Sequence, residues 1–362
     1  MSKIKNIEFL RVILLLSIIM YHMCVSTSFA FYKLFSDVSL FKFLSRAFDS
    51  GMNGVEAFFI ISGFLFVLTF KDGQSFCDFI KNKYLRLSPV ICSSVILSLI
   101  GLQLGIVKFK VIPDLLSIFL LNNFIISFGK GSNGVLWFTS ALFAALVLYW
   151  IIIKVFKRSY LKYILISLIF LAYIFLMVFS HGRFVQPHRN YFLIFNIGFL
   201  RAVGGIGIGC LIGMFYKEYF KERSKISYIQ LNYSYIGITA LELLFLGFTF
   251  WWLMMPHVRM NNIIFVIIFT ILFILFLLRK GAISNLFDKD IFVYLGKFQY
   301  SIYVVHFIIL KILNLGFWKY HANFVVTNPF LVIMVNLIIV CIFGILTYHF
   351  VEAPCVRYLK KI

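Results

Sequence analysis

The chain has 362 residues, of which 62% are hydrophobic and only 13% are charged, and its mean hydropathy is +0.99. A soluble domain of this size could not keep so much apolar surface from aggregating, so the composition excludes that class and indicates a polytopic membrane protein. The formal net charge of +21 would suit a nucleic-acid-binding protein, but the distribution of the basic residues argues against that class.

Apolar segments long enough to cross a bilayer recur along the whole chain. The expected spans are 7–27, 52–70, 88–107, 134–153, 163–180, 193–216, 233–254, 261–278, 299–317 and 329–351. An even number of crossings puts both termini on one side, and that side holds about twice as many of the 34 Lys and Arg residues as the opposite side. This bias predicts cytoplasmic termini and needs no nucleic-acid partner. We predict an all-α polytopic membrane protein, with about 10 transmembrane helices in one bundle and a single domain over residues 1–362.

The first span carries three polar residues on one side. Arg11 and His22 are eleven residues apart, about 1,100° of helical rotation, so they share a helix face to within roughly 20°. Their axial separation is roughly 16 Å, about half of the hydrocarbon thickness, and Glu8 lies one turn before Arg11. A charged residue at the bilayer centre costs about 2.5–3.5 kcal/mol on insertion scales and usually lines a cavity with a function. This face therefore predicts the wall of an active site.

The second span places Glu56 near its outer end. Because the first two spans run antiparallel, we expect His22 and Glu56 at similar depth in the outer half of the bilayer. A carboxylate that accepts from an imidazole fixes its tautomer and makes the other ring nitrogen a better base. The pattern suggests a His22–Glu56 dyad. The alternative is that Glu56 packs against Arg46 or lines a polar outer vestibule.

Two basic residues follow the second span on its cytoplasmic side. Lys83 and Arg86 are three positions apart, so on a helix the two cations share a face. Paired cations of this kind suit a polyphosphate ligand. The alternative interpretation is an ordinary positive-inside loop.

The stretch 111–128 is apolar but short for a membrane span. We expect it to form a re-entrant or interfacial helix. If it crossed the membrane, every later helix would invert and the charge bias would weaken.

Polar groups also occur in the middle spans. Arg201 lies in mid-span, so it is expected to be paired or to face water. The glycine-rich run 204–209 that follows is inside a span, which favours close helix packing over a dinucleotide-binding loop. Trp137, at the outer start of the fourth span, suits either an interfacial anchor or a substrate contact.

The ninth span begins with a run of polar side chains. Tyr300 and Ser301 precede His306, and Tyr303 stands one turn before it. An intramembrane histidine can serve only as an interhelical hydrogen-bonding group, or it can belong to the site.

Together these segments resemble membrane-bound acyltransferase family 3, whose members modify cell-surface polysaccharides. The resemblance covers nearly the whole chain and keeps the order of the family's elements. The matching elements are Arg11 with His22, the block Gly54 to Phe64 with its acidic Glu56, Lys83 with Arg86, Leu136-Trp137-Phe138, Arg201 with the following glycines, the Tyr300-Ser301 to His306 block, and Val351-Glu352 with Pro354. The family often has arginine at the position of Lys83, and a lysine keeps the charge but loses the bidentate geometry.

The resemblance implies O-acyl transfer, usually of acetyl from acetyl-CoA to a sugar hydroxyl. The implied acceptor is a surface glycan, such as O-antigen, capsule or exopolysaccharide, or its undecaprenyl-linked precursor. The implied location is a multi-pass position in a bacterial inner membrane. Some members carry an extracytoplasmic SGNH hydrolase domain, but this chain ends right after its last span, so we expect none here. No metal is predicted, because the six cysteines are scattered without the spacing of a metal site.

The expected mechanism uses both ends of the first span. The phosphates of CoA would meet Lys83, Arg86 and Arg11, and the thioester would point toward His22. His22 would act as general base on the acceptor hydroxyl or would carry the acyl group transiently, with Glu56 orienting it. The alternative function is a transporter, flippase or polymerase of lipid-linked glycans, because such proteins also carry intramembrane Arg and His.

Overall fold

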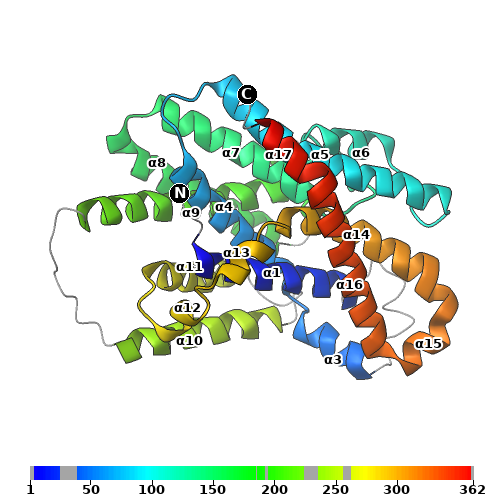
Figure 1. The fold of residues 1–362 in the computed structure, drawn as a ribbon. Helices are drawn as coiled ribbons and strands as arrows, with labels where there is room; N and C mark the ends of the chain where they lie inside the picture. Colours follow the sequence, from blue (N-terminus) through cyan, green and yellow to red (C-terminus); the bar gives the residue numbers. More distant parts are fainter. Residues whose placement is uncertain are drawn as a thin grey trace.

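The computed structural model describes residues 4–24, 39–184, 186–191, 195–223, 235–255 and 262–359 (Figure 1). The long helices are α1 (Lys5–Cys24), α4 (Gly54–Thr69), α5 (Phe76–Gln103), α7 (Trp137–Val155), α8 (Arg158–Ser180), α9 (Ile197–Arg223), α10 (Tyr235–Leu253), α11 (Asn262–Leu278), α14 (Gln299–Ile312) and α16 (Pro329–Thr347). The short elements are α3 (Ser39–Ala47), α6 (Val111–Ile118), α12 (Ala282–Leu286), α13 (Asp290–Leu295), α15 (Ala322–Thr327), α17 (Ala353–Leu359) and the paired strands β1 (Asn190–Tyr191) and β2 (Phe195–Asn196).

The membrane-spanning prediction is confirmed as an all-α polytopic bundle. Within the described residues, 9 helical stretches are long and apolar enough to cross a membrane. Helix α11 adds a shorter apolar helix of 17 residues, about 26 Å long at 1.5 Å per residue. The side of the membrane on which the termini lie stays a prediction.

The apolar stretch 111–128 does not form a membrane-length helix. Its helix α6 has 8 residues, which span about 12 Å, and the chain turns after Phe119. This is the short, non-spanning form that the sequence favoured, and α7 can therefore run back antiparallel to α5.

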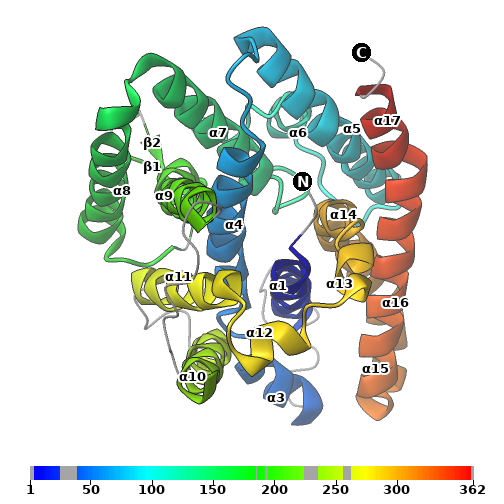
Figure 2. The same cartoon turned by 60° about the vertical axis from the view of Figure 1, so that its left-hand side comes forward.

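The centre of the bundle is formed by α4 and α9, which pack along each other (Figure 2). Glycines make this contact close: a side chain at Gly63 would overlap the carbonyl of Ile206, and one at Gly209 would overlap the carbonyl of Ile60. Small residues let membrane helices approach in this way. The prediction that the glycine-rich run serves helix packing is confirmed.

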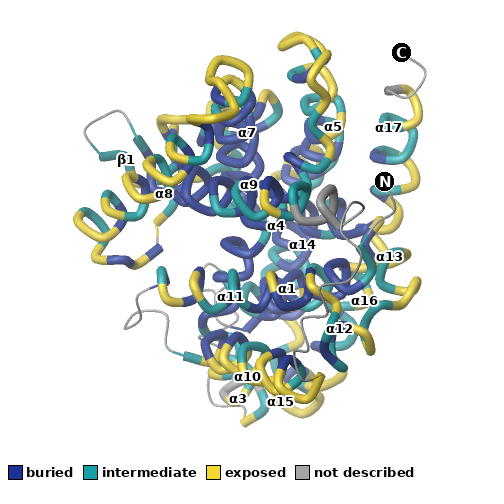
Figure 3. The backbone as a smooth tube through the Cα atoms, turned by 90° about the vertical axis from the view of Figure 1, so that its left-hand side faces the viewer, coloured by how far each residue is buried: buried dark blue, intermediate teal, exposed yellow. Residues whose placement is uncertain are grey.

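Burial separates the bundle interior from its lipid-facing rim. Figure 3 shows buried backbone along α4, α9 and α14, whereas α8 and α10 have long exposed stretches. The exposed residues on those outer helices are largely apolar, such as Phe170 on α8 and Leu243 on α10. Apolar side chains on the rim are expected where lipid replaces water as the outer solvent.

Candidate functional site

His22 meets His306 where α1 and α14 lie side by side. His306 Nε2 is 3.2 Å from His22 Nδ1, and the two ring centroids are 5.1 Å apart. His306 is fully buried, whereas His22 is only partly buried and stays accessible. The structure therefore joins two histidines that the sequence placed on separate spans.

The surrounding carbonyls fix the proton positions in this pair. His306 Nδ1 lies 2.6 Å from Tyr303 O, and a carbonyl can only accept, so that nitrogen carries the proton. In a neutral ring His306 Nε2 is then an acceptor. His22 Nδ1 lies 3.0 Å from Ile18 O, so it donates, shared between that carbonyl and His306. His22 Nε2 is left with its lone pair, which is the state required of a general base.

Glu56 does not orient His22 in the described structure. Its fully buried carboxylate accepts from Arg201 Nε at 2.6 Å and forms an ion pair with the same guanidinium. Arg201 also donates from Nη1 to Phe184 O at 2.7 Å, and its guanidinium lies 4.6 Å from the ring centroid of Trp137. The predicted His22–Glu56 dyad is wrong, because α4 turns Glu56 toward α9. The expected pairing of Arg201 is confirmed, and buried Trp137 packs against it as a cation–π partner.

A second polar group lies at the other end of α1. Arg11 donates from Nη1 to both carboxylate oxygens of Glu8, at 3.0 and 2.9 Å, so the two residues share one side of α1 as the sequence predicted. Gln299 Nε2, at the start of α14, donates to the backbone carbonyl of Glu8 at 3.4 Å. Gly296 makes room for the Glu8 carboxylate, since a side chain there would overlap it. This ion pair is only partly buried on the arginine side, with 19% of the Arg11 side chain exposed.

The cations of α5 lie beside this polar group around Glu8 and Arg11, which is called the inner group below. Arg86 is exposed and lies close enough to Arg11 and Lys83 to act on their charges. The Lys83 ammonium lies 5.7 and 5.9 Å from the ring centroids of Phe79 and Phe66. Arg86 thus lies electrostatically close to one cation of α1 and to one of its own helix.

Side chains of α14 and of the helical segment Tyr348–Glu352, which follows α16, complete the inner group. Ser301 Oγ donates to Glu352 Oε2 at 2.6 Å, and Glu352 also acts on the charge of Arg11. Tyr300 donates to the backbone carbonyl of Leu87 at 2.7 Å, which ties α14 to α5 beside Arg86. The structure therefore gathers the remaining predicted residues around Arg11.

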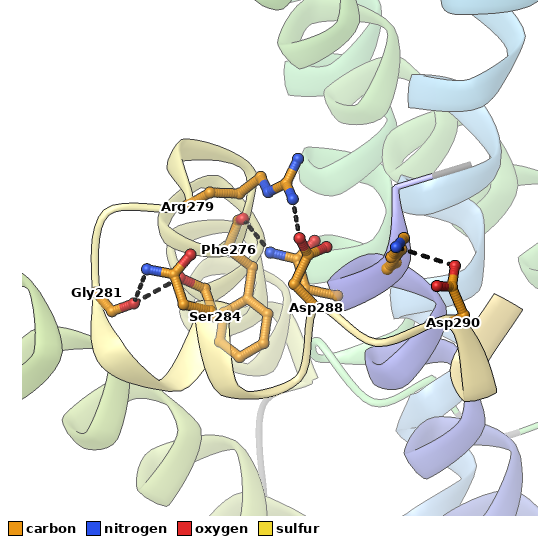
Figure 4. A network of polar contacts seen from close by, with 9 residues as sticks. Phe276, Arg279, Gly281, Ser284, Asp288 and Asp290 are labelled. Atoms are coloured by element: carbon orange, nitrogen blue, oxygen red, sulfur yellow. Dashed lines mark hydrogen bonds and ion pairs between the residues drawn. The ribbon is translucent and has the colours of Figure 1, made fainter. Parts of the chain in front are cut away.

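The inner end of α1 is held by the end of α11 and by the segment that follows it (Figure 4). Asn6 donates to the backbone carbonyl of Phe276 at 2.7 Å, and Lys5 pairs with Asp290 at 2.9 Å. Arg279 pairs with Asp288 within the segment after α11, and this pair joins the two ends of that segment. These contacts fix the start of α1 and so the position of the inner group.

The sequence analysis did not identify two residues that lie near His22. Phe307 meets the His22 ring edge to face, with centroids 5.2 Å apart at 88°. Lys130, in the loop before α7, lies 5.9 Å from the Phe307 ring centroid. Phe307 could have been suspected as the neighbour of His306, but Lys130 belongs to no motif. Across the described ranges, no three His, Cys, Asp or Glu residues gather closely enough to hold a metal ion.

Comparison with known proteins gives one match. The model of the family described as "Acyltransferase domain" matches residues 4–349, which is nearly the whole chain. No curated protein matches the chain significantly. No solved structure matches it either.

Proposed function

The chain belongs to acyltransferase family 3, and on that premise we propose that it transfers an acyl group to a hydroxyl of a cell-surface polysaccharide or its lipid-linked precursor. Acetyl from acetyl-CoA is the proposed donor group. The apolar helices and the family support a multi-pass membrane protein, and we propose a bacterial inner membrane as its location.

The observation that carries this proposal is the contact between His22 and His306. It leaves His22 Nε2 unprotonated on a partly accessible ring, while His306 is buried and held by Tyr303 O. His306 is therefore a positioning residue, and His22 is the proposed general base. This assignment gives His306 the orienting role that the sequence had given to Glu56.

The proposed reaction is a single acyl transfer. His22 Nε2 takes the proton from the acceptor hydroxyl as the oxygen attacks the thioester carbonyl. The new carbon–oxygen bond forms, the carbon–sulfur bond breaks, and the proton passes to the departing thiolate. General-base catalysis of this kind contributes about 10²–10⁴-fold to rate.

The inner group supplies the proposed donor site. Arg11, Lys83 and Arg86 provide positive charge from two helices, which suits the phosphates of CoA. Arg11 and His22 lie on the same helix about 16 Å apart, so a donor bound at the inner group would extend along α1 toward His22. Glu8 and Glu352 balance part of this charge when no donor is bound.

The test is mass spectrometry of surface glycan from cells that express the wild type or a variant. A mass increment of one acyl group with the wild type identifies the reaction and names the acyl group. We expect His22→Ala to lower the transfer rate by about 100-fold or more. Exposed His321, whose ring stacks on that of Phe317 and lies within hydrogen-bond distance of Phe317 O, supplies the matched control His321→Ala.

The role of His306 needs a conservative variant. His306→Ala should lower transfer about 10- to 100-fold. His306→Gln should recover part of this loss, since an amide oxygen can accept from His22 Nδ1. Full transfer by folded His22→Ala would contradict the general-base proposal. An acyl group trapped on His22 by rapid quenching would replace it with the acyl-carrier route.

A further inference from the structure

Lys130 is held beside His22 by a short chain of contacts. Its ammonium lies over the ring of Phe307, and that ring meets the His22 ring edge to face. Lys130 thus stands one aromatic ring away from the proposed general base. Sequence topology places this loop and the outer half of α1 on the same side of the membrane.

The loop around Lys130 is fixed on α14. Asn133 donates to Val304 O at 2.8 Å and to Ser94 Oγ at 2.5 Å, which anchors the loop two residues before His306. Gly134 lies directly under the lysine stem: a methyl group there would come within 2.8 Å of Lys130 Cε and 3.1 Å of Phe307 Cζ. The stem of exposed Lys130 therefore passes directly over Gly134, beside the Phe307 ring.

Two further lysines lie in the neighbourhood of Lys130. Lys110 and Lys311 are close enough to act electrostatically with it, and partial desolvation, then the charge of Lys110, lowers the pKa of Lys130. Asp114 is near, but its buried carboxylate accepts from the Lys110 and Ser132 backbone N–H groups and from Ser132 Oγ. Its charge is thus engaged in holding the loop. A bound anion would stabilise the charged form of Lys130.

We infer that the acceptor of this acyltransferase carries an anionic group, a phosphate or a carboxylate, and that Lys130 binds this group so that the neighbouring hydroxyl faces His22. This inference rests on the proposed function. Lysine is a compact point charge that suits such an anion, and Lys110 and Lys311 add positive potential that attracts it. The anion can belong to the lipid phosphate of a lipid-linked glycan or to an acidic sugar.

The experiment uses purified protein in vesicles, acetyl-CoA and three acceptor preparations from the producing cells. These are the lipid-linked glycan, the same glycan released from its lipid phosphate by mild acid, and the lipid-linked glycan with its carboxyl groups chemically reduced. The variants are Lys130→Gln, Lys130→Arg and Lys108→Gln. Lys108 is exposed in the same part of the chain and serves as the control, since only its backbone carbonyl contributes to the loop, by accepting from Ser132.

We expect Lys130→Gln to raise the KM for the intact acceptor about tenfold and to weaken its dependence on salt. Lys130→Arg and Lys108→Gln should stay near the wild type. The preparation that raises the wild-type KM to the level of Lys130→Gln identifies the anion as lipid phosphate or sugar carboxylate.

Two results would overturn the inference: a wild-type KM for Lys130→Gln, or a wild-type enzyme that uses the phosphate-free and carboxyl-reduced preparations as well as the intact glycan. If the wild type acylates none of the preparations, the proposed function fails instead.

Discussion

Arg201 shows how one charge is accommodated inside the bundle. Its guanidinium is satisfied by Glu56, by the carbonyl of Phe184 and by the face of Trp137. Only 3% of its side chain is exposed, so the pair has little access to water. Such a pair is expensive to break, because removing one partner leaves the other charge buried alone.

We predict that Arg201→Leu destabilises the folded protein by about 3–5 kcal/mol, because Glu56 would remain buried without a counter-charge. The double variant with Glu56→Gln should recover a large part of that loss. Thermal unfolding in detergent measures both, with Arg183→Leu, at an exposed position after α8, as control. An Arg201→Leu protein as stable as the wild type would show that the pair is not structurally important.

Residue-level prediction succeeded where partners share a helix. The spacing of Glu8 and Arg11 determines their contact, because three residues make almost one turn. It failed for Glu56, since matching depth on two helices says nothing about rotation about the helix axis. That rotation follows from the glycines that bring α4 against α9, and their partners lie about 150 residues away in the chain.

At the scale of elements, the loop before α7 is clamped to the segment that carries β1 and β2. Ser127 and Asn190 exchange two hydrogen bonds at 2.8 and 2.9 Å, and Ser127 Oγ lies 3.2 Å from His188 Nδ1. Burial, then the charges of Lys130 and Lys110, lowers the pKa of His188 from 6.5 to about 4. These contacts between Ser127 and the segment of His188 and Asn190, called the clamp below, therefore hold His188 as a neutral imidazole.

This clamp predicts a loss of stability in acid. The pKa of His188 is lower in the folded protein, so the unfolded chain binds its proton more readily. The contribution of His188 is fully present above about pH 6.5 and is lost as the pH falls toward 4. Between pH 7 and 4.5 we expect about 2–3 kcal/mol of pH-dependent stability from this residue. Thermal unfolding over that range measures it, and an equal pH slope in His188→Gln would contradict the assignment.

Element positions followed largely from hydropathy, with errors at the ends. The third span was predicted to begin at residue 88, but α5 begins at Phe76 and continues through Pro89. The basic residues of its first turns lower the local hydropathy, although they continue the same helix. Short helices such as α12 and α13 escaped prediction because they have no membrane-length apolar run.

At the scale of the whole molecule, α1 connects two polar groups of different chemistry. Its inner end holds Arg11 among cations and carboxylates, and its outer half holds His22 beside Lys130. The sequence alone could predict that α1 carries polar residues near one end and a histidine in its other half. They could not predict which distant helices supply the partners, because bundle packing sets those contacts.

The proposed function requires that these two ends face opposite compartments. The charge bias predicts that Lys289 is cytoplasmic and Lys108 lies outside, and both are exposed in the structure. In a cysteine-free background, a membrane-impermeant maleimide should label Lys108→Cys in intact cells and Lys289→Cys only after permeabilisation, with the cysteine-free parent as blank. The reverse pattern would place the inner group outside. A CoA donor from the cytoplasm could then not reach Arg11, and the acceptor could not approach Lys130 from outside.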